Sequence, residues 1–195
     1  NEKLGGNHMD NVYVTCPRFE DEHFLIRLIS IEDSKDLLKV YSDQEAVPFF
    51  NSDNCHGDDF YYTTYERVEE AVNFWLWAYE VKGFVRFSII DQKSQQVIGT
   101  IEIFHRDSKD FFNDCGLLRL DLRSDYETKE IVAEILSLIV EPFFELFDCT
   151  MIGTKAKEIA KERRKGLEEL GFQATEECLI GEDGTKYFGY YYKMK

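Results

Sequence analysis

The hydrophobic pattern of residues 116–147 predicts a strand, a short polar turn and a long amphipathic helix. Leu118, Leu120 and Leu122 alternate with charged residues, which is the period of a half-buried strand. Apolar residues then recur at helical spacing and gather on one face, at Ile131, Ile135, Leu138, Ile139, Pro142, Phe143 and Leu146. A strand that leads into a helix leaves the first amide N–H groups of the helix unpaired, so a phosphate can bind there.

The rest of the chain also alternates between strand patterns and helix patterns. Strand patterns cover residues 24–29, 84–90, 97–104, 116–123 and 149–154, with two more around a turn at 177–180 and 187–194. Helix patterns cover residues 31–42, 64–83, 130–147 and 155–170. Ser30, with Asp33 three residues later, and Thr64 are expected to cap the first two helices.

Length and composition predict one globular domain over residues 9–195. The chain has 195 residues, of which 44% are hydrophobic and 15% aromatic, and this length suffices for one well-buried core. Residues 1–8 carry no periodicity, and we interpret them as an expression-tag remnant or a disordered segment before Met9.

Charge and cysteine usage exclude several classes of function. The net charge of −15 argues against nucleic acid or an anionic membrane as a partner, because both need a basic surface. It suits a cationic partner or serves solubility alone. The five cysteines form no C-x-x-C pair, so we expect no metal site. Their odd number, without a signal-peptide pattern or an apolar run of membrane-spanning length, indicates free thiols in the cytoplasm.

Four short stretches and their order resemble the GNAT acyltransferases, particularly the branch of ribosomal-protein N-terminal acetyltransferases. The stretches are Phe24–Leu28 with Ser30–Asp33, Val97–Ile101, Ala133-Glu134, and Glu168–Phe172 with its Gly-Phe turn. The resemblance implies an α/β (α+β) fold. It has a mixed, mostly antiparallel sheet of about six or seven strands, flanked by about four helices.

The resemblance also implies a cofactor, acetyl-CoA, and an acceptor that is a small-molecule amine or a protein N-terminus. In the family, the main chain of the turn after the fourth strand holds the cofactor pyrophosphate. The sequence pattern of this turn is Arg or Gln, then any two residues, then Gly, any residue, and finally Gly or Ala. The cofactor-binding positions of this chain would be Leu120, Leu122, Glu127, Thr128, Lys129, Glu130, Ile131 and Val132. The turn at 127–132 lacks both glycines and the basic or amide residue. Two glutamates there repel a pyrophosphate.

A second departure lies in the last predicted helix. Where the family often carries Asn and Ser near the pantetheine, this chain has Ala160 and Arg163. The surrounding residues are basic. They would either pair with the 3′-phosphate of the cofactor or form a solvated helix face with neighbouring glutamates.

Acetyl transfer needs a neutral amine, a polarised thioester oxygen and a proton for the leaving thiolate. Glu102, His105 and Asp121, on the third and fourth strands, are the candidate bases, and Tyr126 in the turn is a candidate acid. The alternative is that each charged residue marks only the solvated face of its strand. The tyrosines near the C-terminus suit a core or a homodimer surface.

Two functions therefore remain open. The chain is either an N-acetyltransferase that moves an acetyl group directly from acetyl-CoA to an amine, or a GNAT-fold binding or regulatory domain with a decayed cofactor turn.

Overall fold

The computed structural model describes residues 11–195, and the interpretation of residues 1–8 lies outside the described residues. In chain order the strands of the main sheet are β1 (Phe19–Glu20), β2 (Phe24–Leu28), β3 (Val85–Asp91), β4 (Gln96–Arg106), β5 (Cys115–Leu122), β6 (Met151–Lys155), β7 (Gln173–Ala174) and β10 (Tyr190–Met194). Within the described residues these eight strands are arranged β1-β2-β3-β4-β5-β6-β10-β7. Only the pair β5 and β6 is parallel, so the predicted mixed, mostly antiparallel sheet is confirmed.

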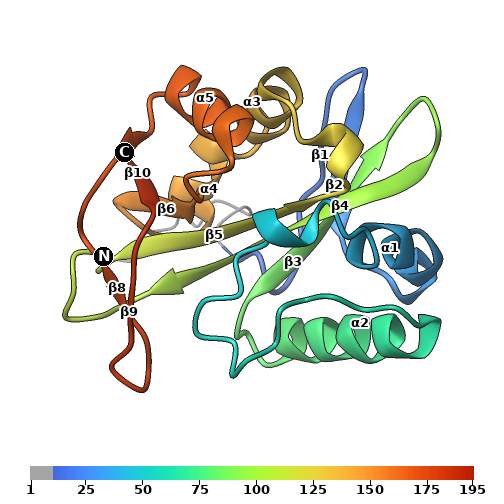
Figure 1. Ribbon diagram of the computed structural model, residues 1–195, viewed down its shortest axis with the longest axis horizontal. Coiled ribbons are helices and arrows are strands. Elements are labelled where there is room, and N and C mark those ends of the chain that lie inside the picture. Colours follow the sequence, from blue (N-terminus) through green and yellow to red (C-terminus); the bar gives the residue numbers. More distant parts are fainter. Residues whose placement is uncertain (1–10) are drawn as a thin grey trace, which may run out of the picture.

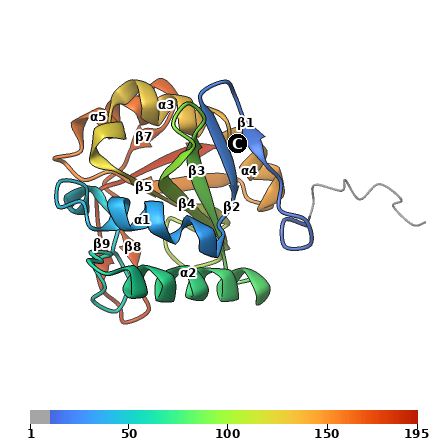
Figure 2. The same cartoon turned by 90° about the vertical axis from the view of Figure 1, so that its right-hand side faces the viewer.

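Helices cover both faces of this sheet (Figures 1 and 2). The helices are α1 (Ser34–Tyr41), α2 (Tyr65–Glu80), α3 (Lys129–Ser137), α4 (Val140–Leu146) and α5 (Lys161–Glu169). In Figure 2, α1 and α2 lie below the sheet, whereas α3 and α5 lie above it. A separate ribbon of β8 (Leu179–Ile180) and β9 (Lys186–Tyr187) lies near the β4–β5 loop.

Burial of β5 is more complete than the sequence pattern predicts, because all eight of its residues are buried. Leu118, Leu120 and Leu122 pack into the core beneath α3 and α4, as expected. The opposite face carries Arg119 and Asp121, which are also buried. The prediction of a half-buried strand is wrong here, because α1 and α2 cover the polar face.

Helix caps follow the sequence closely. The Asp33 carboxylate accepts from the Ser30 N–H at 2.9 Å, and the Thr64 hydroxyl accepts from the Arg67 N–H at 3.2 Å. Each contact pairs an amide that the helix itself leaves free. A short 3₁₀ turn at Ile31–Asp33 precedes α1.

The prediction of one long helix over residues 130–147 is wrong in one respect, because the structure has two helices there, α3 and α4. The break falls at Leu138-Ile139, where Ile139 has the non-helical angles φ −124° and ψ −23°. Pro142 has no N–H to donate to the Leu138 carbonyl, and its ring would collide with that carbonyl in a continuous helix.

The predicted helix at 155–170 starts later than expected, at Lys161. Lys155 ends β6, and the Ala156 N–H still donates to the Gly189 carbonyl at 2.9 Å. The chain therefore stays extended past the end of the strand. Within residues 11–195, no helix combines the length and apolar composition that crossing a membrane requires.

Candidate active site and cofactor cleft

Strands β5 and β6 separate at the place where the cofactor is expected. Their parallel pairing runs from Cys115 opposite Met151 to Leu118 opposite Thr154, whereas β5 continues to Leu122. Two parallel strands that stop pairing expose main-chain groups along the gap. The gap lies below the start of α5, beside the predicted cofactor residues Leu120 and Leu122.

The gap is filled by the side chain of Arg163, from α5. Its Nη1 donates to the Leu120 carbonyl at 2.7 Å and to the Phe49 carbonyl at 3.4 Å. Its Nε and Nη2 donate to the two carboxylate oxygens of Glu127 at 2.8 and 2.7 Å. The two side chains are only 2% and 6% exposed. Burial alone would lower the pKa of Arg163, but Glu127 outweighs this effect and the pKa is raised.

The turn at residues 127–132 forms an ordinary helix cap. The Glu127 N–H donates to the Ser124 carbonyl at 3.1 Å and the Thr128 N–H to the Tyr126 carbonyl at 2.8 Å. The Thr128 hydroxyl accepts from the Ile131 N–H at 3.3 Å. Three amides that line such a turn are therefore already used within the chain.

The remaining predicted cofactor residues point to other partners. Lys129 forms an ion pair with Glu169 at 3.3 Å, Glu130 is exposed and Val132 is buried in the core. α5 also packs directly on the first turn of α3, because a Cβ added at Gly166 would lie 3.0 Å from the Lys129 carbonyl.

A buried network of charges lies on the other face of β5. Arg86 donates to Glu102 at 2.8 Å and to Asp121 at 3.2 Å, and Arg119 lies 3.2 Å from the second Glu102 oxygen. All four residues are at most 9% exposed. Two predicted bases, Glu102 and Asp121, are thus brought together through a guanidinium.

Aromatic side chains surround Arg86. Its guanidinium lies 3.9 Å from the centre of the Trp75 ring, and the Tyr41 hydroxyl donates to Asp121 at 2.7 Å. Burial alone would lower the pKa of Arg86, but Glu102, Tyr41 and Asp121 together raise it. The Arg86 charge is therefore held permanently against Glu102 and Asp121.

A cavity of about 500 Å³ opens beside this network. Glu102 and Arg119 form part of its wall, and most of the rest comes from α2 and the segment before it. Its other residues are Asn54, Cys55, His56, Asp58, Phe60, Tyr62, Arg67, Glu70, Ala71, Phe74, Trp75, Phe84, Phe104 and Glu182. Arg67 pairs with Asp58 at 3.1 Å. The balance of charges on the wall is acidic.

The other two predicted catalytic residues lie away from this cavity. His105 is the penultimate residue of β4, and its Nδ1 lies 2.7 Å from the Phe147 carbonyl oxygen. Tyr126 donates to Asp91 near the far end of the sheet. Burial, followed by that hydrogen bond, raises the pKa of Tyr126 to about 12. The structure therefore does not bring His105 or Tyr126 together with Glu102 and Asp121.

Comparison with known proteins identifies the family. A family model described as "Acetyltransferase (GNAT) domain" matches residues 23–173. This chain belongs to the GNAT acetyltransferase family. A search of curated proteins finds no match.

Solved GNAT structures share the fold at low sequence identity. Ribosomal-protein-S5-alanine acetyltransferase from Vibrio fischeri is 18% identical with a TM-score of 0.67, covering 91% of this chain and 96% of its own. A GNAT acetyltransferase from Bacillus anthracis is 15% identical, with a TM-score of 0.66 and coverages of 91% and 98%. RimL, a ribosomal L7/L12 α-N-protein acetyltransferase in complex with coenzyme A, is 11% identical, with a TM-score of 0.67 and coverages of 91% and 98%.

The cofactor of the GNAT family does not fit the side-chain arrangement of this cleft. The Arg163 guanidinium already donates to the Leu120 carbonyl, and it holds the Glu127 carboxylate at the start of the turn, where the family places the pyrophosphate. Moving Arg163 aside would leave Glu127 buried without a partner, which costs about 3–5 kcal/mol.

Two arginines of this GNAT site, Arg86 and Arg119, are missing from the candidates proposed from sequence. Arg86 lies between Val85 and Phe87, and Arg119 lies between Leu118 and Leu120. A basic residue flanked by apolar residues in a strand is the signal that marks them. The sequence predicts that Arg163 lies either on a solvated helix face or beside a phosphate. It occupies neither environment, because it is buried against Glu127.

Proposed function

We propose that this GNAT-family chain is a binding domain for a small organic amine, and that its acetyl-CoA cleft is closed by its own side chains. The observation that supports this most directly is the bidentate, buried pair of Arg163 and Glu127 between β5 and α3. The pair occupies the position where the cofactor would bind, and its two side chains satisfy each other's hydrogen bonds and charges. The fold is retained while the cleft is filled.

The cavity supports an amine as the ligand. Aromatic faces attract cations, and Phe74, which is 54% exposed, lines the cavity, whereas the Trp75 and Phe60 rings already face the Arg86 guanidinium. Glu70 and Glu182 add negative charge, while Glu102 is already shared by Arg86 and Arg119. A small aromatic or aliphatic amine therefore matches both the shape and the charge of the wall.

Calorimetric titration with acetyl-CoA tests the closed cleft. We expect no heat of binding to the wild type up to about 1 mM, which corresponds to about −4 kcal/mol. The double substitution Arg163→Ser with Glu127→Gln removes both charges together and should raise the affinity at least tenfold. Circular dichroism shows whether the double variant is folded. Micromolar binding of acetyl-CoA to the wild type would overturn the closed cleft.

Fluorescence of Trp75 tests the cavity. Trp77 is 54% exposed, so Trp77→Phe removes most of the solvent-exposed signal and leaves the buried Trp75 as reporter. Phenethylamine should quench or shift this emission saturably, whereas the similarly sized anion phenylpropionate should not. Equal responses to the two probes would contradict recognition of an amine.

A second candidate function is direct N-acetyl transfer from acetyl-CoA to a primary amine or a protein N-terminus. The divergence of β5 and β6, together with Glu102 in the wall of the acceptor-sized cavity, favours it. Glu102 is then the proposed base, while roles for Asp121, His105 and Tyr126 stay predictions. Release of free coenzyme A thiol in the presence of an amine is the measurement that would establish this function.

A further inference from the structure

A cluster of His105, Asp107 and Asp114 lies where strands β4 and β5 meet the loop that connects them. Their ligand atoms, one ring nitrogen and two carboxylate oxygens, all lie within 4.8 Å of one another. The cluster is near the start of β5, because Gly116 pairs with His105, whereas the closed cleft is near the other end. It is thus separate from both the cleft and the aromatic cavity.

The register of the hairpin forces two negative charges together. Arg106 opposite Cys115 is the last pair of the β4–β5 ladder, so Asp107 and Asp114 follow directly on the two sides of the loop. Like charges that face each other across a hairpin destabilise it. In the described part of the chain, His105 is the only basic side chain within 4.0 Å of either carboxylate. A cation between the two carboxylates would relieve this repulsion.

The orientation of His105 is that of a metal ligand. Its Nδ1 lies 2.7 Å from the Phe147 carbonyl oxygen, which can only accept, so the proton must be on Nδ1. Nε2 then points at Asp107 Oδ1, 3.0 Å away, and Asp114 Oδ1, 3.5 Å away. A neutral imidazole would aim its lone pair at two carboxylates. A backbone carbonyl that fixes the tautomer in this way is typical of histidines that bind a metal.

Asp114 is held from outside the cluster as well. The Thr150 hydroxyl donates to Asp114 Oδ2 at 3.0 Å, and the Thr150 N–H donates to the Asp114 carbonyl at 3.2 Å. Oδ1 is thereby left facing His105. Support of the second oxygen by a neighbouring hydroxyl is the arrangement that orients carboxylate ligands.

The spacing of the three ligand atoms fits a divalent cation. Two ligands bound at about 2.1 Å and separated by about 90–110° lie about 3.0–3.4 Å apart. The Nε2 separation of 3.0 Å from Asp107 lies in that range, and the separation of 3.5 Å from Asp114 lies just above it. We propose that His105, Asp107 and Asp114 bind a divalent transition-metal ion of the zinc class, with water in the open position. Imidazole and carboxylate ligands together suit this class.

Sulfur is not part of this proposed site. Cys115 follows Asp114 directly, but its Sγ packs beside Gly153, inside the core. Because Cys115 is fully buried and its Sγ faces Gly153, Cys115 is not among the proposed ligands.

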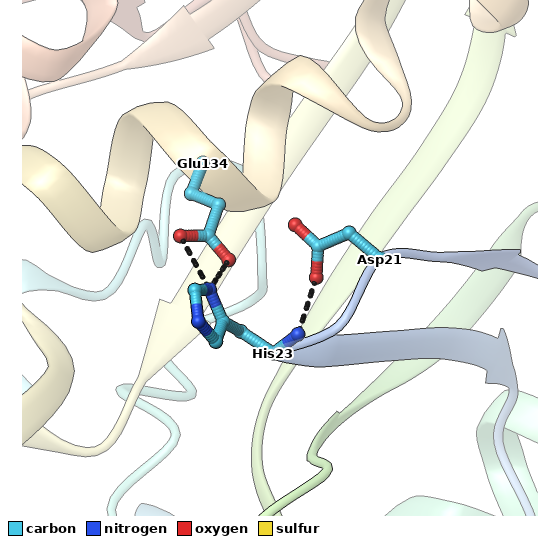
Figure 3. Close-up of side chains that lie close together, drawn as sticks. All are labelled: Asp21, His23 and Glu134. Carbon is cyan, nitrogen blue, oxygen red and sulfur yellow. Dashed lines mark hydrogen bonds and ion pairs between the residues drawn. The ribbon is translucent and has the colours of Figure 1, made fainter.

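The cluster of Asp21, His23 and Glu134 provides a matched contrast (Figure 3). There His23 Nδ1 faces Glu134 at 2.9 Å and Nε2 faces Glu22 at 3.1 Å, so both nitrogens meet carboxylates. Asp21 Oδ1 already accepts the N–H groups of His23 and Phe24, each at 2.8 Å. A doubly protonated imidazole satisfies this cluster, and it serves as the control.

Metal titration of the full chain tests the proposal. Protein treated with EDTA and desalted is titrated with ZnCl₂ by calorimetry in a non-coordinating buffer, and in parallel with CoCl₂ by visible absorption. We expect one micromolar or tighter site for Zn²⁺, and cobalt bands without a sulfur-to-metal charge-transfer band. His105→Gln and Asp114→Asn should each weaken binding at least tenfold, or about 1.4 kcal/mol. His23→Gln should leave the affinity unchanged.

Three results would overturn the site. They are the absence of zinc binding, binding that His105→Gln does not weaken, or a cobalt–thiolate band. If no zinc binds and NMR shows that both ring nitrogens of His105 are protonated at neutral pH, the positive charge between the two carboxylates is that of the imidazolium and not of a metal ion. Urea unfolding of each variant shows whether a lost site reflects lost structure, and Asp107→Asn, in an exposed side chain, provides a second ligand variant that keeps the fold.

Discussion

At the scale of single residues, the pair Arg163–Glu127 makes the sharpest prediction about stability. Arg163→Met alone leaves the buried Glu127 carboxylate unpaired and should lower the free energy of unfolding by about 3–5 kcal/mol. Arg163→Met with Glu127→Met removes both charges and should cost far less than the single substitution. Urea denaturation of the wild type, both single variants and the double variant measures the coupling.

Lys165→Met is the matched control for that series. Lys165 is also on α5, but its side chain is 62% exposed and its ion pair with Glu162 is long, at 3.8 Å. Exposed pairs of this kind contribute about 0–1 kcal/mol. A cost of Arg163→Met as small as that of Lys165→Met would show that the Arg163–Glu127 pair is not closed in solution.

Single charged residues were also where the sequence was least informative about the site. Alternation along β5 correctly assigns Leu120 to one face and Asp121 to the other. It does not say what covers each face, because that depends on helices far along the chain. The sequence offers Glu102 and Asp121 as either bases or solvated charges. The solvated alternative is wrong, because both are buried beside Arg86, whereas their role as bases stays a prediction.

At the scale of elements, the contact between α5 and α3 predicts the sign of a glycine substitution. Helix propensity alone would make Gly166→Ala stabilising by about 1 kcal/mol. The new Cβ would lie 2.9 Å from Val132 Cγ1 and 3.0 Å from the Lys129 carbonyl. Overpacking of this kind costs about 1–3 kcal/mol. We expect net destabilisation in thermal unfolding, and a stabilised variant would mean that the two helices separate easily.

The link between the β1–β2 turn and α3 should depend on pH. The hydrogen bond to Glu134 raises the pKa of His23 above its usual value, so protonation stabilises the folded state. This contribution is fully present below the unfolded pKa of about 6.5 and is lost as the pH rises through the higher folded pKa. The stability difference between wild type and His23→Gln should therefore shrink from about pH 6 to pH 9. A constant difference would contradict the ion pair in Figure 3.

Element order was predictable from the sequence, whereas the break before α4 and the start of α5 were not. Strand and helix periods placed β2 to β6 and α1 to α3 because each has a clear apolar face. The break before α4 was missed because Pro142 fits the apolar stripe of a longer helix. Pro142 breaks the helix four residues earlier, at the Leu138 carbonyl, and the hydrophobic periodicity of the sequence does not indicate such a break.

At the scale of the whole molecule, the fold was predictable and the closed cleft was not. The missing glycines of the 127–132 turn indicated a poor phosphate site. Closure itself depends on three segments that meet only in the folded chain, at Phe49, Glu127 and Arg163. The same holds for the proposed metal site, where Phe147 orients His105 from 42 residues away.

The acidic excess of the whole chain makes a last prediction. With 38 acidic and 23 basic residues, the folded state carries self-repulsion that salt should screen. Between about 0.01 and 0.1 M NaCl the Debye length falls from about 30 to about 10 Å. The melting temperature should rise over this range by about 2–4 °C, as expected for about 1 kcal/mol. EDTA in every sample keeps metal binding out of the measurement.

A charge-reversal variant separates this repulsion from other effects of salt. Glu176 and Glu177 are exposed, and no ion pair joins them to another residue in the described part of the chain. Glu176→Lys with Glu177→Lys makes the net charge less negative by four and should flatten the dependence of melting temperature on NaCl. A melting temperature that falls with salt would mean that attractive pairs, such as Arg27–Asp33 at 2.8 Å, outweigh the repulsion.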